Sequence, residues 1–444
     1  MGYGAAAVAH LADGRIAFVE GGAPGDLAEI ELTSEKKRFV SARVIALTEP
    51  GTARVHASDC AAGDCNASCG GCPWAHLTEQ AQLEAKRANV IEALVRVGRI
   101  DRTRVEKITR PCAASKRSWG YRNKLELGCS TDLAGRLLLG LHNAESSDIS
   151  PITTCPLACK PIAAAPKALQ GALRYLGGTR ELGLFRVGVR GSLRTRDVEV
   201  ALWTEPGPFP RAEVARVIGS AVRATSIVRV IAQPGKARKI KGVEKLEGKG
   251  AWEEELAWGD APEDHARYLT SAPSFFQVNT AQAERLVNFA LEGLRRDGFS
   301  LDGALVADLY AGGGTFSIPL ARAGAEVIAV ESAGSSVRDL RRNAEMNGEF
   351  IEVIGGDAKR ELPEIGGLDA LLVDPPRAGL ATGIVESIAA AAPERIAYVS
   401  CDPQTLARDI ALFETNDYVL ESVQPVDLFP QTYHVETVAI LRAR

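Results

Sequence analysis

Residues 304–315 read ALVADLYAGGGT, and the architecture of the C-terminal half of the chain can be worked out from them. Residues 304–310 predict a buried strand, and the three glycines that follow predict a tight turn at which the backbone can approach a ligand closely. From about residue 270 onward, strand patterns alternate with helix patterns. This alternation is typical of a parallel sheet covered by helices.

The turn at 311–315 suits one kind of nucleoside ligand. The next predicted strand, 325–331, ends at Glu331, about 20 positions after the turn, where a carboxylate can bind ribose hydroxyls. Ser317 stands where the third glycine of a G-x-G-x-x-G dinucleotide motif would be, so a pyrophosphate would be poorly bound. S-adenosylmethionine (SAM) has no phosphate, so the pattern favours SAM over NAD. Asp357, at the end of the third strand, is expected near the adenine.

Two more predicted strands end in side chains that can take part in chemistry. Residues 368–374 deliver Asp374, within the sequence DPPR, to a strand tip, where ligands of such sheets bind. Residues 395–400 lead to Cys401, at a corner between a strand and a predicted helix. A helix N-terminus favours a thiolate, which predicts a reactive cysteine. Taken by itself, such a residue is more often a small buried hydrophobe, as most free cysteines are.

A second group of cysteines lies in residues 60–76, CAAGDCNASCGGCPWAH. Cys69-x2-Cys72 encloses two glycines, and such a turn aims two thiolates at one zinc ion or iron–sulfur cluster. Cys155, before Pro156, is the best distant ligand, and either Cys60 or Cys65 would supply the fourth. His76 could complete a zinc site, but a histidine at such a position is more often a packed or surface residue.

The N-terminal half predicts two further domains. Residues 1–52 predict a small antiparallel barrel of the kind that binds oligonucleotides, with the basic tract 36–38 either meeting phosphates or forming a solvated turn. Residues 53–268 predict an α+β domain that begins with an amphipathic helix at 77–98. In this domain WGYRNK places aromatic and cationic side chains together, which suits RNA bases and phosphates or the rim of a sheet; the RNA candidates are Tyr121, Arg122 and Lys124.

Length and composition limit the classes of protein that are possible. A chain of 444 residues predicts several domains, and a net charge of −4 confines any nucleic-acid binding to local patches. No apolar run approaches the ~20 residues that span a bilayer, and the first residues lack the pattern of a secretory signal. We expect a cytoplasmic monomer whose nine cysteines serve metal binding, chemistry or packing rather than disulfides.

Six motifs in one order connect these observations to a known family. They are FFQVN (275–279), DLYAGGGTFSI (308–318), AVES (329–332), DPPRAGL (374–380), SCDPQTLARD (400–409) and FPQTYHVETV (429–438). With them the chain resembles the RNA uracil-5-methyltransferases, which make 5-methyluridine in tRNA or rRNA. The resemblance implies a TRAM-like, OB-like β-barrel at 1–52, a central domain with a 4Fe-4S cluster at 53–268, and a class I, Rossmann-like SAM methyltransferase domain at 269–444. Helix 77–98 is expected against the catalytic domain.

The resemblance also implies roles for individual residues. Cys401 would be the nucleophile that attacks C6 of uracil, and Glu436 would remove the C5 proton. Asp374 would contact both SAM and the uracil edge, and Arg377 would contact RNA. The residues that would bind SAM are Gln277, Tyr310, Thr315, Glu331, Asp357 and Asp374; Thr315 stands where the family often has asparagine.

The sequence leaves the identity of one of the four cluster ligands undecided. The family usually has five residues between the first and second cysteines, whereas eight separate Cys60 from Cys69 and three separate Cys65 from Cys69. RVHASDC resembles the family's approach to the first ligand, which favours the set Cys60, Cys69, Cys72 and Cys155, with Cys65 as the alternative to Cys60.

Three other activities are weighed against this interpretation. The spacing of Cys65, Cys69 and Cys72 also occurs in radical-SAM enzymes, but that reaction leaves the DPPR, SCDP and HVE motifs unexplained. A non-catalytic RNA-binding protein would have no need of both Cys401 and Glu436. A cytosine-5 enzyme would use similar thiol chemistry, but its usual motifs are absent from the sequence.

Overall fold

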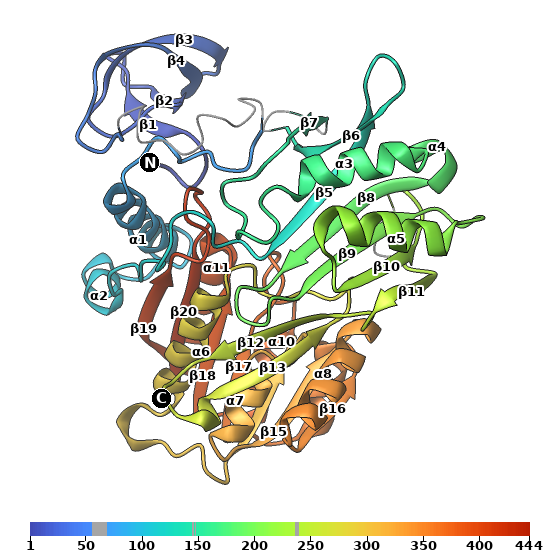
Figure 1. Cartoon of the computed structure of the whole chain (residues 1–444). Coiled ribbons are helices and arrows are strands. Elements are labelled where there is room, and N and C mark those ends of the chain that lie inside the picture. The colour runs from blue at the N-terminus through green and yellow to red at the C-terminus, as the bar shows by residue number, and fades with distance from the viewer. Residues whose placement is uncertain (56–68, 144–145, 147, 236–238) are drawn as a thin grey trace.

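The computed structural model describes residues 1–55, 69–143, 146, 148–235 and 239–444 (Figure 1). Cys60 and Cys65 therefore lie outside the described residues. Within the described ranges, no helix is both long enough and apolar enough to cross a membrane.

The C-terminal half is built on one seven-stranded sheet, with helices on both faces (Figure 1). Five strands run parallel and one strand, β20, runs antiparallel to both of its neighbours. In spatial order the strands are β16 (Ile351–Gly355), β15 (Glu326–Glu331), β14 (Leu305–Leu309), β17 (Ala370–Val373), β18 (Arg395–Ser400), β20 (Glu436–Ala443) and β19 (Tyr418–Val426). The predicted α/β sheet is confirmed, with each glycine-rich or reactive motif at a strand tip.

Alternating side chains of these strands form two separate cores. Val306 and Leu372 face one core, whereas Ala307 and Leu371 face the other. The helices of this half are α6 (Thr280–Leu294), α7 (Ser317–Arg322), α8 (Gly334–Asn347), α9 (Ala358–Ile365), α10 (Ile384–Ala391) and α11 (Pro403–Thr415). Residues of α6 and α7 pack in the first core, and residues of α9, α10 and α11 pack in the second.

Two elements outside the predicted catalytic domain also pack on this sheet. Helix α1 (Glu79–Arg96) places Val90 and Leu94 in the core that α11 shares, as expected for helix 77–98. The two strands β12 (Trp252–Ala257) and β13 (His265–Thr270) pack on the opposite face. Their side chains share a core with α6, although the sequence pattern had assigned them to the central domain.

The central domain holds a second seven-stranded sheet, in the order β11-β10-β9-β8-β5-β6-β7. Its strands are β5 (Lys124–Thr131), β6 (Leu137–His142), β7 (Ile149–Pro151), β8 (Leu184–Gly191), β9 (Val198–Thr204), β10 (Ser226–Ile231) and β11 (Gly242–Gly248). Its helices are α3 (Ala165–Tyr175), α4 (Gly178–Leu182) and α5 (Arg211–Val222), and the short α2 (Arg102–Ile108) follows α1. The predicted α+β character is confirmed.

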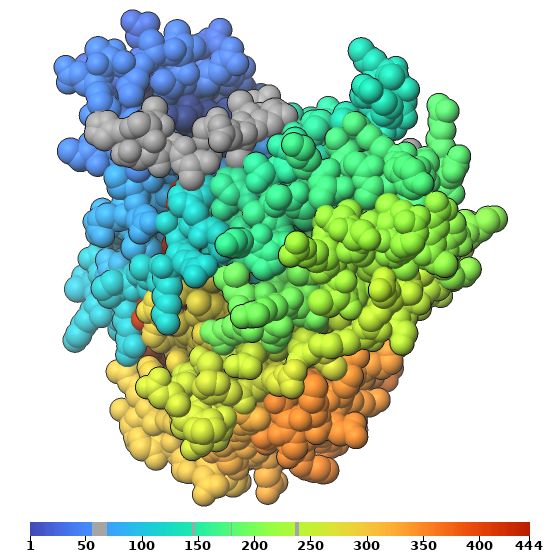
Figure 2. Space-filling model, in the orientation of Figure 1, coloured from blue at the N-terminus to red at the C-terminus, as the bar shows by residue number. Residues whose placement is uncertain are grey.

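The N-terminal strands form a small lobe at the opposite end of the molecule from the catalytic sheet (Figure 1; blue in Figure 2). The strands are β1 (Ala7–His10), β2 (Ile16–Glu20), β3 (Leu27–Glu35) and β4 (Phe39–Glu49), and they pair in the order β1-β2-β4-β3. The prediction that all pairs are antiparallel is wrong for one of them. After the antiparallel β3–β4 pair, β4 runs alongside β2 in the same direction.

Candidate active site

The chain reversal at β20 brings two distant residues to the same edge of the sheet. Ser400, the last residue of β18, pairs with Thr437 of the antiparallel β20. Cys401 follows Ser400, and Glu436 precedes Thr437, so both residues lie just beyond the same end of the β18–β20 ladder. The tips of β14, β15 and β17 lie along this edge because these strands are parallel to β18.

Cys401 is half-buried and lies next to two acidic side chains. Burial, followed by the charges of Glu436 and Asp374, raises the pKa of its thiol to about 12, while Arg377 acts in the opposite direction. Burial and the two carboxyls therefore oppose the thiolate that a helix N-terminus is expected to favour. Asp402 caps α11 and accepts hydrogen bonds from the amides of Gln404 and Thr405, so the helix end is already neutralised.

Glu436 is almost completely buried at the start of β20. Burial, followed by the charge of Asp374, raises the pKa of its carboxyl well above the usual range, and Arg377 opposes the shift. A carboxylate with a raised pKa is a stronger base, which is what proton removal near neutral pH requires. Asp374, at the tip of β17, is partly exposed, and burial together with the charge of Asp308 raises its pKa to about 7.

Asp308 lies beneath the glycine-rich turn, near the end of β14. Ser317 Oγ donates to its Oδ2 at 2.5 Å, whereas no described residue bonds its buried Oδ1. Burial raises the pKa of Asp308 to about 7. A buried acceptor without a partner costs free energy, so this oxygen is suited to a ligand that donates a hydrogen bond or carries positive charge.

The turn itself has the backbone geometry that the sequence predicts. Gly312 and Gly314 have φ angles of 56° and 91°, which only glycine adopts without strain. Tyr310 has a φ of 64°, and such a strained non-glycine residue often marks a functional site. Glu331 accepts hydrogen bonds from Gly312 N at 2.9 Å and Ala333 N at 2.6 Å, which fixes its carboxylate beside the turn.

The other expected SAM contacts lie around this turn. Asp357 caps α9, accepts a bond from Lys359 N at 3.0 Å and is exposed. It is close enough to Tyr310 that its charge adds to the effect of burial, which raises the pKa of Tyr310 to about 12. Thr315 is half-buried. Gln277 is buried, and Asn123 of the central domain holds its carbonyl at 2.9 Å.

The residues expected to contact RNA lie in different environments. Tyr121 is only 6% exposed, and its hydroxyl donates to the Pro430 carbonyl at 3.1 Å, so its ring is not presented to a base as the sequence suggested. Lys124 pairs with Glu126 at 2.8 Å, and Arg122 Nε donates to the Lys124 carbonyl. Arg377 is exposed beside the nucleophile, which suits an RNA contact.

Two residues near Cys401 were not predicted from the sequence. Tyr3 donates from its hydroxyl to Asp402 Oδ2 at 3.3 Å, 399 residues away along the chain. Arg377 Nη2 lies 2.8 Å from His434 Nδ1. Burial, followed by the Arg377 charge, lowers the pKa of His434 to about 4, so this imidazole is neutral at pH 7. No local pattern in the sequence marks Tyr3, because its contacts come only from tertiary folding.

The cysteine motif lies against the core of the central domain. Cys69 and Cys72 pack on the hydrophobic cluster that contains Cys155. Burial raises the pKa of Cys155, and the nearby Cys69 adds to the shift. Among the residues that the structure describes, no group of three His, Cys, Asp or Glu side chains is arranged to hold a metal ion. The fourth expected ligand, Cys60 or Cys65, lies outside those residues.

Known proteins are similar to this chain over nearly its whole length. A family model described as tRNA (uracil-5-)-methyltransferase matches residues 252–355 and 366–444. An uncharacterized RNA methyltransferase of Gloeobacter violaceus is 35% identical over 98% of this chain and 93% of its own length. One from Thermotoga maritima is 30% identical over 99% and 96%. The crystal structure of Pyrococcus abyssi tRNA (uracil-54, C5)-methyltransferase with S-adenosyl-L-homocysteine has a TM-score of 0.72 and 27% identity, and 98% of each chain is covered.

Proposed function

This chain belongs to the RNA (uracil-5-)-methyltransferase family, and from that premise we propose that it methylates C5 of a uridine in tRNA or rRNA through a covalent adduct between Cys401 and C6 of the base. The observation that carries the proposal is the meeting of Cys401, Glu436 and Asp374 at the sheet edge that also holds the glycine-rich turn. The target base cannot be reached while it is stacked, so it must be single-stranded or flipped out.

The chemistry assigns one task to each of Cys401, Arg377 and Glu436. C5 of uracil is a poor nucleophile, and addition of the Cys401 thiolate to C6 makes an enolate whose C5 can attack a methyl sulfonium. The Cys401 thiol must first lose its proton to water, and the neighbouring Arg377 favours that loss. After methyl transfer, Glu436 takes the proton from C5, the C5–C6 double bond forms again and the Cys401 sulfur leaves.

The residues around the turn fit SAM, which supplies a methyl group on a positively charged sulfur. Glu331 is held where it can accept ribose hydroxyls, and Asp308 has a buried oxygen free to receive positive charge. The SAM contacts we propose are Gln277, Tyr310, Thr315, Glu331, Asp357 and Asp374.

We further propose that Cys69, Cys72 and Cys155 bind a 4Fe-4S cluster, with Cys60 or Cys65 as the fourth ligand. The placement of the three described cysteines around one core supports this, and thiolates are the usual ligands of such clusters. These residues would hold the cluster in the central domain.

RNA recognition is assigned to the N-terminal lobe together with Arg377 and Arg122. The rings of Phe18 and Phe39 meet edge to face at 5.8 Å, and each residue is 39% exposed. The basic tract 36–38 directly precedes Phe39. Exposed aromatic rings next to cations suit stacked bases and phosphates of a single strand.

The test uses the wild type, Cys401→Ala and Glu436→Gln with labelled SAM and total RNA that lacks 5-methyluridine, followed by nucleoside mass spectrometry. We expect 5-methyluridine only with the wild type, and mapping of the labelled RNA separates tRNA from rRNA. Product formed by Cys401→Ala would overturn the covalent mechanism. If no protein makes product but SAM is cleaved under reducing conditions, a radical reaction replaces the proposal. Trapping with 5-fluorocytidine rather than 5-fluorouridine RNA would indicate a cytosine enzyme.

A further inference from the structure

The segment 427–431, which leads from β19 toward β20, has no ladder of its own. Gln431 has a φ of 68°, so the backbone turns sharply there. All five carbonyls of the segment nevertheless accept a hydrogen bond from a residue outside it. The donors, in order, are Gln282, Asn279, Lys86, Tyr121 and Trp74, at 3.0 to 3.1 Å. An irregular segment with this many fixed carbonyls is rigid rather than loosely packed.

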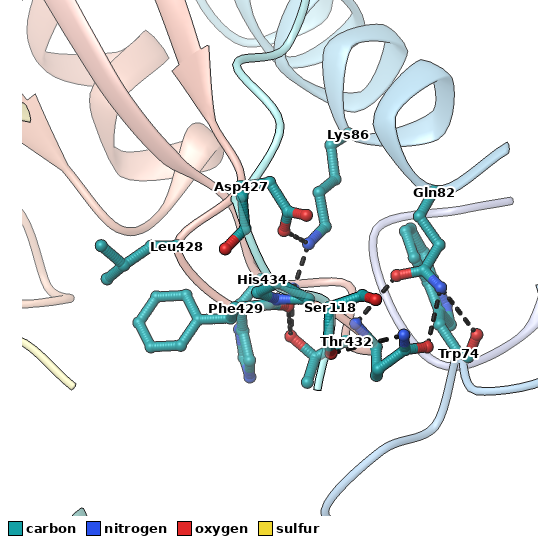
Figure 3. Close-up of polar contacts among 12 residues, drawn as sticks. Trp74, Gln82, Lys86, Ser118, Asp427, Leu428, Phe429, Thr432 and His434 are labelled. Carbon is teal, nitrogen blue, oxygen red and sulfur yellow. Dashed lines mark hydrogen bonds and ion pairs between the residues drawn. The ribbon is translucent and has the colours of Figure 1, made fainter. Parts of the chain in front are cut away.

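Two side chains of helix α1 make the most direct contacts. Lys86, which is fully buried, forms an ion pair with Asp427 and also donates to the Phe429 carbonyl (Figure 3). Gln82 accepts from Gln431 N at 2.8 Å and donates to Gln431 Oε1 at 2.9 Å. Figure 3 shows both side chains pointing from the helix toward the segment. Through Lys86 and Gln82, helix α1 therefore contacts the first, third and last residues of the segment.

These contacts bear on the position of Glu436. Val426, immediately before Asp427, pairs with Glu436 in the β19–β20 ladder. The ion pair between Lys86 and Asp427 therefore fixes the chain directly after Val426, the strand partner of Glu436. Gln82 fixes the other end of the segment at Gln431, five residues before Glu436. A catalytic group displaced by about 1 Å can lose up to about a hundredfold in rate.

We propose that Lys86, with Gln82 and Tyr121, positions the base Glu436 for removal of the C5 proton. This inference rests on the proposed function, since it names the residues that would support proton removal from C5, the second half of that reaction. Lys86 and Tyr121 act through the 427–431 segment and touch neither substrate nor reacting atoms. A buried ion pair is seldom more stable than apolar residues of the same volume, which agrees with a role in placing the segment rather than in stability.

The predicted defect is specific to one step. If Glu436 is misplaced, Cys401 still adds to C6 and the methyl group is still transferred. The C5 proton then leaves slowly, so the methylated protein–RNA adduct accumulates. Loss of stability alone would lower the amount of active protein without changing the proportion held as adduct.

The experiment compares Lys86→Met and Tyr121→Phe with Glu436→Gln and Val90→Ala. Val90 is a fully buried residue of the same helix that packs in the core shared with α11, so its truncation destabilises the protein as a matched control. Adduct that survives denaturing electrophoresis and 5-methyluridine are both measured with saturating unmodified RNA. We expect Lys86→Met to release product about tenfold to a hundredfold more slowly and to accumulate adduct, as Glu436→Gln does. Tyr121→Phe should show the same effect more weakly, and Val90→Ala should not show it.

Three other results are possible, and each leads to one conclusion about the inference. Wild-type adduct levels and release rates in both Lys86→Met and Tyr121→Phe would overturn the inference. If Lys86→Met does not fold, Tyr121→Phe, which removes only one hydroxyl, decides the question. If Glu436→Gln itself forms no adduct, the proposed function and the positioning inference are both overturned, whereas adduct in Glu436→Gln with wild-type behaviour of the other variants overturns the inference alone.

Discussion

Ser400 and Thr437 pair across the antiparallel strands β18 and β20, and this one pair places Cys401 next to Glu436. The two residues that would open and close the covalent cycle thus come from opposite directions along the chain. Their closeness has an electrostatic cost that can be measured. Burial is the largest cause of the raised pKa of the thiol, the carboxyl of Glu436 adds to it, and Arg377 is the cation that opposes the shift.

Replacement of Arg377 by glutamine should slow the first covalent step. Without the guanidinium the pKa of Cys401 rises further, and each unit of that rise removes about tenfold of the thiolate at a given pH. Stopped reactions with 5-fluorouridine RNA would measure the rate of adduct formation at saturating RNA. Saturation matters because Arg377 is also an RNA-contact candidate. An unchanged rate under these conditions would show that Arg377 does not activate the thiol.

Protein stability and SAM affinity should respond to pH in opposite directions. Burial raises the pKa of Asp308 to about 7 in the folded protein, whereas the unfolded value is about 3.9. This group therefore stabilises the fold fully below pH ~4, and that contribution is lost as the pH rises through ~7. The charge that appears as the pH rises toward 7 attracts the sulfonium, so SAM affinity should rise by up to about tenfold per pH unit below pH ~7 and level off above it.

Calorimetric titration with SAM between pH 6 and 8 would measure this dependence. The variant Asp308→Asn keeps the shape of the side chain and removes its titration, so its affinity curve should be flatter. Equal slopes for the wild type and this variant would assign the dependence to another group, with Asp374 as the next candidate because its pKa is also raised to about 7.

Loss of the exposed aromatic pair should weaken RNA binding without affecting the chemistry. We expect Phe18→Ala and Phe39→Ala to cost roughly 1–3 kcal/mol of RNA binding free energy for each base that loses its stacking partner. Fluorescence titration with substrate RNA would measure it, while kcat at saturating RNA should stay the same. Leu27→Ala is a suitable control, because Leu27 is 56% exposed on β3 at the far edge of the lobe. Equal losses for Leu27→Ala and the phenylalanine variants would point to general damage.

Replacement of Cys69 or Cys155 by serine should abolish iron binding. Anaerobically purified wild type is expected to carry about four iron and four sulfide ions per chain, with the visible absorption of an iron–sulfur cluster. Cys129→Ser is the matched control, since Cys129 packs on the same core and is not a proposed ligand. Iron content that is the same in all these proteins, or absent from the wild type, would contradict the cluster.

Local patterns in the sequence predicted the catalytic half well. The strand that ends before Tyr310, the glycine turn, and the positions of Asp374 and Cys401 all follow from residues close together in the chain. Local patterns predict less where the structure is decided by pairing between segments that are distant in the chain. The parallel alignment of β2 with β4 cannot be read from either strand alone. The sequence WGYRNK suggested an exposed Tyr121, but the fold covers its ring and gives its hydroxyl the Pro430 carbonyl as a partner.

The protonation of the site was also out of reach from the sequence. A helix N-terminus after Cys401 suggested a favoured thiolate, but burial of the thiol, together with two carboxyls that are distant in the chain, raises its pKa. Nothing in the sequence of the predicted helix 77–98 distinguishes Lys86 from the other charged residues. Lys86 is completely buried because it pairs with Asp427, which lies 341 residues away along the chain. The periodicity of the helix gives no sign of that partner.

Three of the five residues that hold the carbonyls of 427–431, namely Trp74, Lys86 and Tyr121, precede the matched region that begins at residue 252. The methyltransferase half is consequently not a self-sufficient module, although its sheet looks complete. A chimaera that exchanges the N-terminal half for another RNA-binding domain would have to retain residues 74–121 to keep these three donors. Recombination within this architecture should therefore succeed upstream of Trp74, at the junction with the N-terminal lobe, and fail between residues 121 and 252.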